Sequence, residues 1–159
     1  PVPRVPPAGH AAALDERAAA GPSPVRGYQT GSLDALARSR AGGTDRYVVV
    51  DHKTNRLAHP EEPLTAWHYR PAALERAMAE AHYPLQALLY CVAAHRYLRW
   101  RARGYDPEAN LGGVLYLFLR GMCGPDALDA AGAPPGVFAW RPPAKLVVAS
   151  SDLLAGGRP

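Results

Sequence analysis

The chain contains the run Tyr47-Val48-Val49-Val50-Asp51-His52-Lys53, in which β-branched residues lead to an acid, a histidine and a lysine. Consecutive residues of high strand propensity favour a buried strand. Side chains two positions apart on a strand point to the same face, so Asp51 and Lys53 leave this strand together. The run therefore predicts a carboxylate and an ammonium group side by side at a strand end.

A second strand is expected just before this run, from Gly27 to Leu36, where the side chains alternate in character. The residues from Arg38 to Arg46 include Gly42-Gly43 and have a composition typical of turns. Two consecutive strands with a short connection usually pair antiparallel. Asp34 would then lie beside Asp51 across the strand pair.

Downstream, the pattern predicts a loop, two helices and a third strand. Prolines interrupt the loop, and a proline stands at the first turn of each helix. The third strand is continuously apolar, as expected for a strand covered on both faces. These elements are expected at Thr54–Tyr69 (loop), Pro71–Ala81 (helix), Pro84 to the arginines before Gly104 (helix, with its apolar stripe on Leu85, Leu88, Leu89 and Val92) and Gly112–Leu119 (strand).

This order predicts an α/β fold with a mixed β-sheet flanked by helices. Residues 27–122 form the expected core. Residues 1–26 are rich in proline and alanine and are expected to be irregular. Residues 123–159 are expected to form a loosely docked tail, with a possible edge strand at Lys145–Val148.

Composition sets limits on the class of protein. A length of 159 residues suits one domain, and the start at Pro1 rather than Met suggests a fragment. The formal charge of +4 weakly favours an anionic partner, although a solvated helix end explains the arginine cluster around Arg99 as well. Cys91 and Cys123 lack the spacing of a disulfide framework or zinc site. Without an apolar run of membrane-spanning or signal-peptide length, a cytoplasmic protein is expected.

Asp34, Asp51 and Lys53 together suggest a phosphodiester-cleaving site. Two neighbouring carboxylates repel each other, and binding a cation relieves this repulsion. Hard oxygen ligands suit Mg²⁺, and a lysine beside the ion can stabilise charge on a phosphate in the transition state. Gln86, one turn into the second helix, can hold a phosphate or a water through its amide. The tripeptide alone is common by chance, and Asp51 and Lys53 can equally be surface residues at a strand end.

Four segments, in this order and spacing, resemble the C-terminal nuclease domain of RecB, whose core belongs to the PD-(D/E)xK superfamily. The resemblance runs from about Gly27 to Met122. It is most specific where a Y-x-x-Q motif precedes a glycine-led apolar strand. The segments are Gly31–Leu36, Val48–Asn55, Tyr83–Gln86 and Gly112–Met122.

The resemblance implies an exodeoxyribonuclease that depends on Mg²⁺ and acts in DNA repair and recombination. By position, Asp34, Asp51 and the backbone carbonyl of His52 correspond to metal ligands, and Lys53 corresponds to the catalytic lysine. Tyr83 and Gln86 fill the Y-x-x-Q motif near the DNA. Arg120, at the end of the third strand, is expected either to face DNA or to pair with an acid.

The implied partners are DNA ends and unwound single strands, RecC- and RecD-like subunits and a RecA-like recombinase. No phosphate-binding G-x-x-x-x-G-K-[ST] motif occurs, so a helicase motor is expected on other sequence. Two alternatives stay open: a weak or inactive module that binds DNA or docks a recombinase, and another RecB-like nuclease of the AddA type.

The sequence departs from the resemblance in three places. His52 stands where a tyrosine is common, and the connection at Gly42-Gly43 looks longer than usual. The resemblance also implies a histidine ligand from a helix upstream of Asp34, for which His10 is the only candidate. The Pro-Pro-Ala-Gly residues before His10 do not resemble that helix, so this ligand is expected to be missing from the chain.

Overall fold

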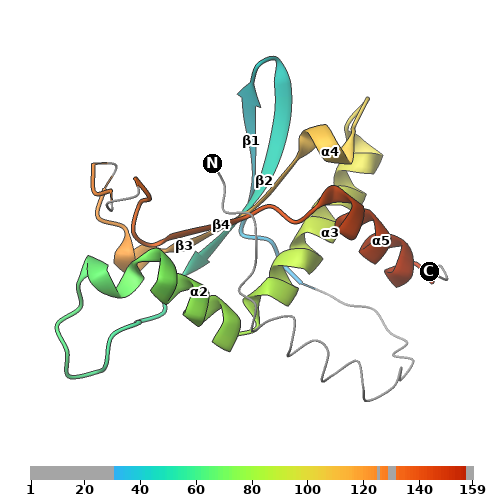
Figure 1. Ribbon diagram of the computed structural model, residues 1–159. Helices are drawn as coiled ribbons and strands as arrows, with labels where there is room; N and C mark the ends of the chain where they lie inside the picture. Colours follow the sequence, from blue (N-terminus) through green and yellow to red (C-terminus); the bar gives the residue numbers. More distant parts are fainter. Residues whose placement is uncertain (1–30, 125, 129–131, 157–159) are drawn as a thin grey trace.

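The computed structural model describes residues 31–124, 126–128 and 132–156. The irregular segment expected at 1–26, including His10, lies outside the described residues. The elements follow the expected β-β-α-α-β order and then continue (Figure 1). They are β1 (Ala35–Ala41), β2 (Thr44–Lys53), η1 (Ala66–Tyr69), α2 (Pro71–Glu80), α3 (Tyr83–Arg101), α4 (Pro107–Asn110), β3 (Leu111–Phe118), η2 (Leu119–Gly121), β4 (Val137–Trp140) and α5 (Ala144–Leu154).

A four-stranded sheet in the order β1-β2-β3-β4 forms the centre of the fold. β2 runs parallel to β3, while β1 and β4 run antiparallel to their neighbours. Because β2 and β3 are parallel, their carboxyl ends lie at the same edge of the sheet, and Lys53 is in register with Phe118. The expected α/β class with a mixed sheet is confirmed.

The first strand begins later than the sequence predicted. Residues 27–30 of the expected strand lie outside the described residues, residues 31–34 are not strand, and β1 starts at Ala35. The expected turn region from Arg38 to Arg46 is largely strand. Gly42 (φ 58°) and Gly43 (φ 79°) form a tight turn in which both backbones have positive φ, as primed hairpin turns require. The expectation of a long connection here was therefore wrong, since this turn needs only the two glycines.

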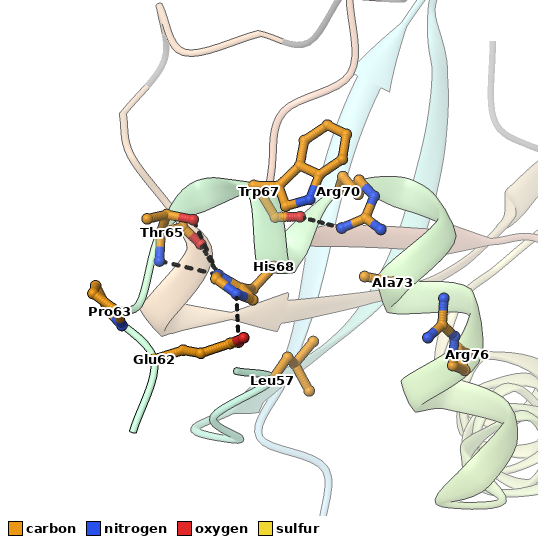
Figure 2. Close-up of a pocket in the computed structure, with 9 residues that line it drawn as sticks. All are labelled: Leu57, Glu62, Pro63, Thr65, Trp67, His68, Arg70, Ala73 and Arg76. Carbon is orange, nitrogen blue, oxygen red and sulfur yellow. Dashed lines mark hydrogen bonds and ion pairs between the residues drawn. The ribbon is translucent and has the colours of Figure 1, made fainter. Parts of the chain in front are cut away.

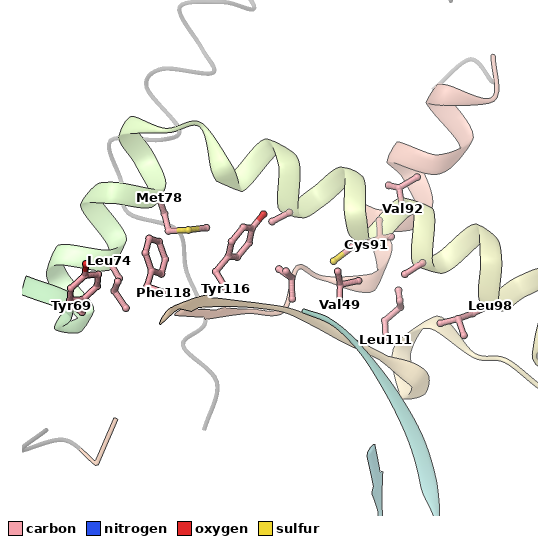
Figure 3. Close-up of a cluster of buried hydrophobic side chains, with 14 residues drawn as sticks. Val49, Tyr69, Leu74, Met78, Cys91, Val92, Leu98, Leu111, Tyr116 and Phe118 are labelled. Carbon is pink, nitrogen blue, oxygen red and sulfur yellow. The ribbon is translucent and has the colours of Figure 1, made fainter. Parts of the chain in front are cut away.

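α2 and α3 cover one face of the sheet, and the core lies between the two layers (Figure 3). Along β3, fully buried side chains that face the helices alternate with half-buried ones. The expected cover on both faces is therefore incomplete in the described part of the chain. The core cluster comprises Val49, Tyr69, Leu74, Met78, Ala87, Cys91, Val92, Ala94, Leu98, Leu111, Val114, Tyr116, Phe118 and Val147.

α3 is rotated relative to the stripe that the sequence suggested. Leu85, expected in the core, is 55% exposed, whereas Val92 of the expected stripe is buried, as are Ala87, Cys91 and Ala94. Large and small apolar residues occur around most of this helix, so spacing alone does not select the buried face. The small residues let α3 approach the sheet, and Cys91 packs in the core.

The C-terminal part is more ordered than the expected tail. Val137–Trp140 pairs with β3, and α5 packs on α3 with Val147 fully buried. Arg96 on α3 donates from Nε to Ser151 Oγ at 3.0 Å, which ties the two helices together. The run Lys145–Val148, expected as an edge strand, lies inside α5 because packing on α3 outweighs its β-branched residues.

Between β2 and α2 the chain forms a loop that ends in η1, within the range expected for a loop. The His68 side chain accepts a hydrogen bond from the Thr65 backbone N–H at 3.2 Å and so caps η1 (Figure 2). Tyr69, which ends η1, is fully buried and anchors this segment to the core. None of the helices in the described ranges is both long and apolar enough to cross a membrane.

Candidate active site at the end of strand β2

The C-terminal end of β2 places an acid and a lysine beneath α3. Val49, Asp51 and Lys53 alternate onto the helix-covered face of the sheet, and Asp51 is only 4% exposed. Its Oδ2 lies 2.8 Å from Lys53 Nζ. That oxygen accepts no hydrogen bond from the described residues, so the ion pair compensates for its burial. The predicted pairing of Asp51 with Lys53 on one face is present.

Asp34 lies beside this pair, as the antiparallel prediction required. Ala35 is in register with Val50, which places Asp34 next to Asp51 across the hairpin. The His52 backbone N–H donates to Asp34 Oδ2 at 2.8 Å, and the His52 ring nitrogen Nδ1 lies 3.3 Å from the same oxygen. The hydrogen bond from the His52 amide lowers the pKa of Asp34, which keeps this carboxylate ionised.

Aromatic rings and an amide surround the ammonium group of Lys53. Its Nζ lies 4.0 Å from the centroid of the Tyr83 ring and 5.1 Å from that of Tyr116, and these two rings stack. Gln86 Oε1 accepts hydrogen bonds from Lys53 Nζ at 3.3 Å and from the Tyr116 hydroxyl at 3.1 Å. The structure thus brings Gln86 and Tyr83 of the Y-x-x-Q motif to the lysine.

Two tyrosines of the site were not predicted from the sequence. Burial and the Asp51 carboxylate raise the pKa of Tyr90, whose hydroxyl interacts with that carboxylate. Burial also raises the pKa of Tyr116, which is in register with Asp51 on β3. The spacing of Tyr83, Gln86 and Tyr90 by three and four residues puts them on one helix face, and this signal was available in the sequence.

Arg120 contacts the backbone of the residue that follows Lys53. Its Nε donates to the backbone carbonyl of Thr54 at 2.9 Å, which ties η2 to the segment that follows Lys53. Within the described ranges Arg120 forms no ion pair with an acid. A contact between Arg120 and DNA stays a prediction.

The donors around Asp51 fit the Mg²⁺ ion that the resemblance implies. The carboxylates of Asp34 and Asp51 and the carbonyl of His52 supply hard oxygens, and Mg²⁺ commonly keeps several waters in its shell. Asp51 Oδ2 already faces one cation, the Lys53 ammonium at 2.8 Å, so a metal ion bound there would share this oxygen with Lys53. No group of three or more His, Cys, Asp and Glu placed to hold a metal occurs in the described ranges. Metal binding at these residues stays a prediction.

Two acids and a lysine at the ends of adjacent strands, on a mixed sheet with flanking helices, are consistent with a nuclease-like α/β core. No family model matches the chain. Proteins named RecBCD enzyme subunit RecB are 52% identical to it in Mycolicibacterium smegmatis and 54% identical in Mycobacterium tuberculosis, each over 87% of this chain. The RecB subunit of Escherichia coli is 36% identical over 83% of it.

The resemblance to RecB is thereby confirmed: this chain is related in sequence to a segment of RecB subunits. The chain spans only 12% of the length of the mycobacterial relatives and 10% of that of the Escherichia coli protein.

Proposed function

We propose that this chain is the C-terminal nuclease domain of a RecBCD-type helicase-nuclease and hydrolyses DNA phosphodiester bonds with Mg²⁺. The observation that carries the proposal is the buried ion pair of Asp51 and Lys53, with Asp34 beside it. An ion pair buried at a strand end is costly unless it has good partners, and a purely structural core has no need of it. The sequence relationship to RecB subunits supports the same function.

The side chains divide the chemistry between them. Asp34, Asp51 and the His52 carbonyl are the proposed Mg²⁺ ligands, and a bound ion would supply Lewis-acid activation of water and phosphate. Lys53, whose side chain is 12% exposed, offers a positive charge for the negative charge that develops on the phosphate oxygens. The carbonyl oxygen of Gln86 is occupied by Lys53, which leaves its NH₂ group to donate to a phosphate oxygen.

Burial of the site strengthens the electrostatic interactions of these charged groups. Tyr116 is fully buried and Tyr83 is half-buried, so the Lys53 ammonium lies in a medium of lower dielectric constant than water. The flat faces of the two rings stabilise a cation without competing for its protons. These contacts fix the position of the Lys53 amine at the strand end.

The proposed partners follow from the same relationship. They are DNA ends and unwound single strands, RecC- and RecD-like subunits, and a RecA-like recombinase that uses the processed strand. The motor of such an assembly would lie outside this chain, which has no nucleotide-binding P-loop motif.

The test is cleavage of linear DNA in the presence of Mg²⁺ by the wild-type protein and by Asp51→Asn. The substitution preserves the shape of the side chain but removes the charge that pairs with Lys53. We expect cleavage to fall by about 100-fold or more, the range seen when one electrostatic group is removed from an active site. Circular dichroism checks that the variant folds.

Asp45→Asn is the matched control, because Asp45 lies on the same strand and its Oδ1 is 2.7 Å from Arg40 Nε. That ion pair is near the surface, so its loss should cost little and leave cleavage unchanged. Equal cleavage by wild type and Asp51→Asn would contradict the nuclease assignment. Preserved DNA binding with no saturable heat on Mg²⁺ titration would then favour the non-enzymatic module.

A further inference from the structure

A pocket of about 620 Å³ opens where η1 leads into α2, outside the proposed active site (Figure 2). The segment that forms it follows directly from the catalytic strand. The Tyr69 hydroxyl donates to the backbone carbonyl of Asn55 at 2.8 Å, two residues beyond Lys53. The Tyr69 ring also packs against Phe118, which is in register with Lys53. The pocket therefore lies at the same end of the sheet as the ion pair of Asp51 and Lys53.

An exposed tryptophan forms one wall of this pocket. Trp67 is 68% exposed, so its indole ring is accessible to a ligand. The guanidinium of Arg70 lies 4.1 Å from the Trp67 ring centroid and donates to the Trp67 backbone carbonyl at 2.7 Å. Arg70 thus supports one side of the indole, and most of the ring surface stays accessible.

The charged residues of the lining favour an anion. Arg70 and Arg76 are its two arginines, and within the described ranges Arg76 has no ion-pair partner. The one acid of the lining, Glu62, is directed at His68, with 3.5 Å between Glu62 Oε2 and His68 Nε2. The one carboxylate of the pocket is thus paired with His68, and it does not compete with an anionic ligand for the two guanidinium groups.

We propose that this pocket binds one nucleotide of single-stranded DNA, with its base stacked on Trp67 and its phosphate on Arg70 and Arg76. A pocket of several hundred Å³ accommodates a ligand of nucleotide size. Aromatic stacking together with guanidinium contacts to phosphate is the usual basis of single-strand binding. Bases of a duplex are already stacked on each other, so the pocket selects an unpaired strand.

The inference rests on the proposed nuclease function, since the pocket supplies a second contact for a strand whose phosphodiester lies at Asp51 and Lys53.

The chain also offers a matched control for the tryptophan. Trp100 is 77% exposed, and Arg101 lies 5.0 Å from its ring centroid. It is near the end of α3, whose Leu98 packs with Leu111 at the opposite end of the sheet.

The experiment measures binding of a fluorescently labelled oligothymidine of about 12 nucleotides, within the site sizes usual for single-strand binding. It uses the whole 159-residue protein without divalent metal, so that no cleavage occurs. We expect Trp67→Ala to raise Kd by about tenfold, the loss of one stacked base. Trp67→Phe should restore most of the affinity because it keeps an aromatic face. Trp100→Ala should bind like the wild type.

A second readout is the quenching of tryptophan fluorescence by the unlabelled oligonucleotide. Quenching should persist in Trp100→Ala and disappear in Trp67→Ala. Binding of a duplex of the same length should be equal in both variants. The proposal is overturned if Trp67→Ala binds the single strand as the wild type does, or if both alanine variants weaken binding equally.

These outcomes separate the pocket from the nuclease assignment. If cleavage depends on Asp51 but single-strand binding does not depend on Trp67, the pocket proposal fails alone. If binding depends on Trp67 while Asp51→Asn leaves cleavage unchanged, the nuclease assignment fails and the binding site stands.

Discussion

Lys53 shows how a buried charge is held in place at the scale of single residues. Three kinds of group contact its ammonium: the Asp51 carboxylate, the Gln86 amide oxygen and the ring of Tyr83. Tyr116 reinforces two of them, because its ring stacks on Tyr83 and its hydroxyl donates to Gln86. The position of the ammonium is therefore set by neighbours that are themselves fixed by packing.

Tyr116→Phe tests this positioning, since it keeps the ring but removes the hydroxyl that orients Gln86. We expect the cleavage rate at saturating DNA to fall by up to about tenfold, the effect of losing one hydrogen bond, with little change in DNA affinity. Single-turnover cleavage and DNA-binding titrations measure the two quantities. In a Lys53→Met background, Tyr116→Phe should cause no further loss. A further loss there would mean that Tyr116 does not act through Lys53.

The residues of the site were only partly predictable from the sequence. Asp51 and Lys53 follow from strand periodicity, and Asp34 follows from hairpin pairing. The spacing of Tyr90 from Tyr83 and Gln86 places it on their helix face, but the rotation of α3 and the register of β3 against β2 decide that Tyr90 and Tyr116 face Asp51. Those features are set by packing between segments far apart in the chain, which local patterns do not encode.

At the scale of elements, the sequence predicted best the helices and turns whose ends are marked by proline or glycine. Pro71 begins α2 as predicted, and the Gly42-Gly43 turn closes the hairpin although β1 itself contains few residues of high strand propensity. β1 forms because the turn brings it against β2. The possible edge strand at Lys145–Val148 is part of the helix Ala144–Leu154, because a short apolar run has no distinguishing period.

Gly136 shows how tightly β4 is joined to the other elements. Its carbonyl accepts from the Phe118 N–H at 2.7 Å, and its own N–H donates to the Tyr69 carbonyl at 3.0 Å. Its φ is +79°, and a Cβ atom there would lie 2.8 Å from the Phe118 carbonyl oxygen. A side chain at this position is therefore disfavoured both by backbone conformation and by contact.

Gly136→Ala should destabilise the protein by about 2–4 kcal/mol, from a left-handed backbone plus overpacking. Gly104→Ala is the control, because Gly104 also has a positive φ (+69°) but has open space around its Cβ position. It should cost about 1–2 kcal/mol, the backbone effect alone. Urea unfolding followed by circular dichroism measures both. Equal losses would show that the contact with β3 contributes nothing.

At the scale of the whole molecule, charge is distributed toward both ends of the sheet. The formal charge is only +4, so overall attraction to DNA is modest and local groups decide where a strand binds. Arg70 and Arg76 lie at the end with the ion pair of Asp51 and Lys53, whereas Arg99 and Arg101 end α3 near the opposite edge. Sequence composition predicted an anionic partner but gave no reason to prefer either end.

Salt dependence distinguishes the two ends. Each phosphate contact on a single strand contributes a slope of about −0.7 to the plot of log affinity against log salt. Because Arg70 and Arg76 share the phosphate of one nucleotide, the double variant Arg70→Gln and Arg76→Gln should bind the oligonucleotide with a slope shallower by about 0.7. Arg99→Gln and Arg101→Gln remove the same charge from the other end and should leave the slope near that of the wild type. If both double variants change the slope equally, DNA binding depends on the net charge of the protein. A strand would then have no preference for the end of the sheet that carries Asp51 and Lys53.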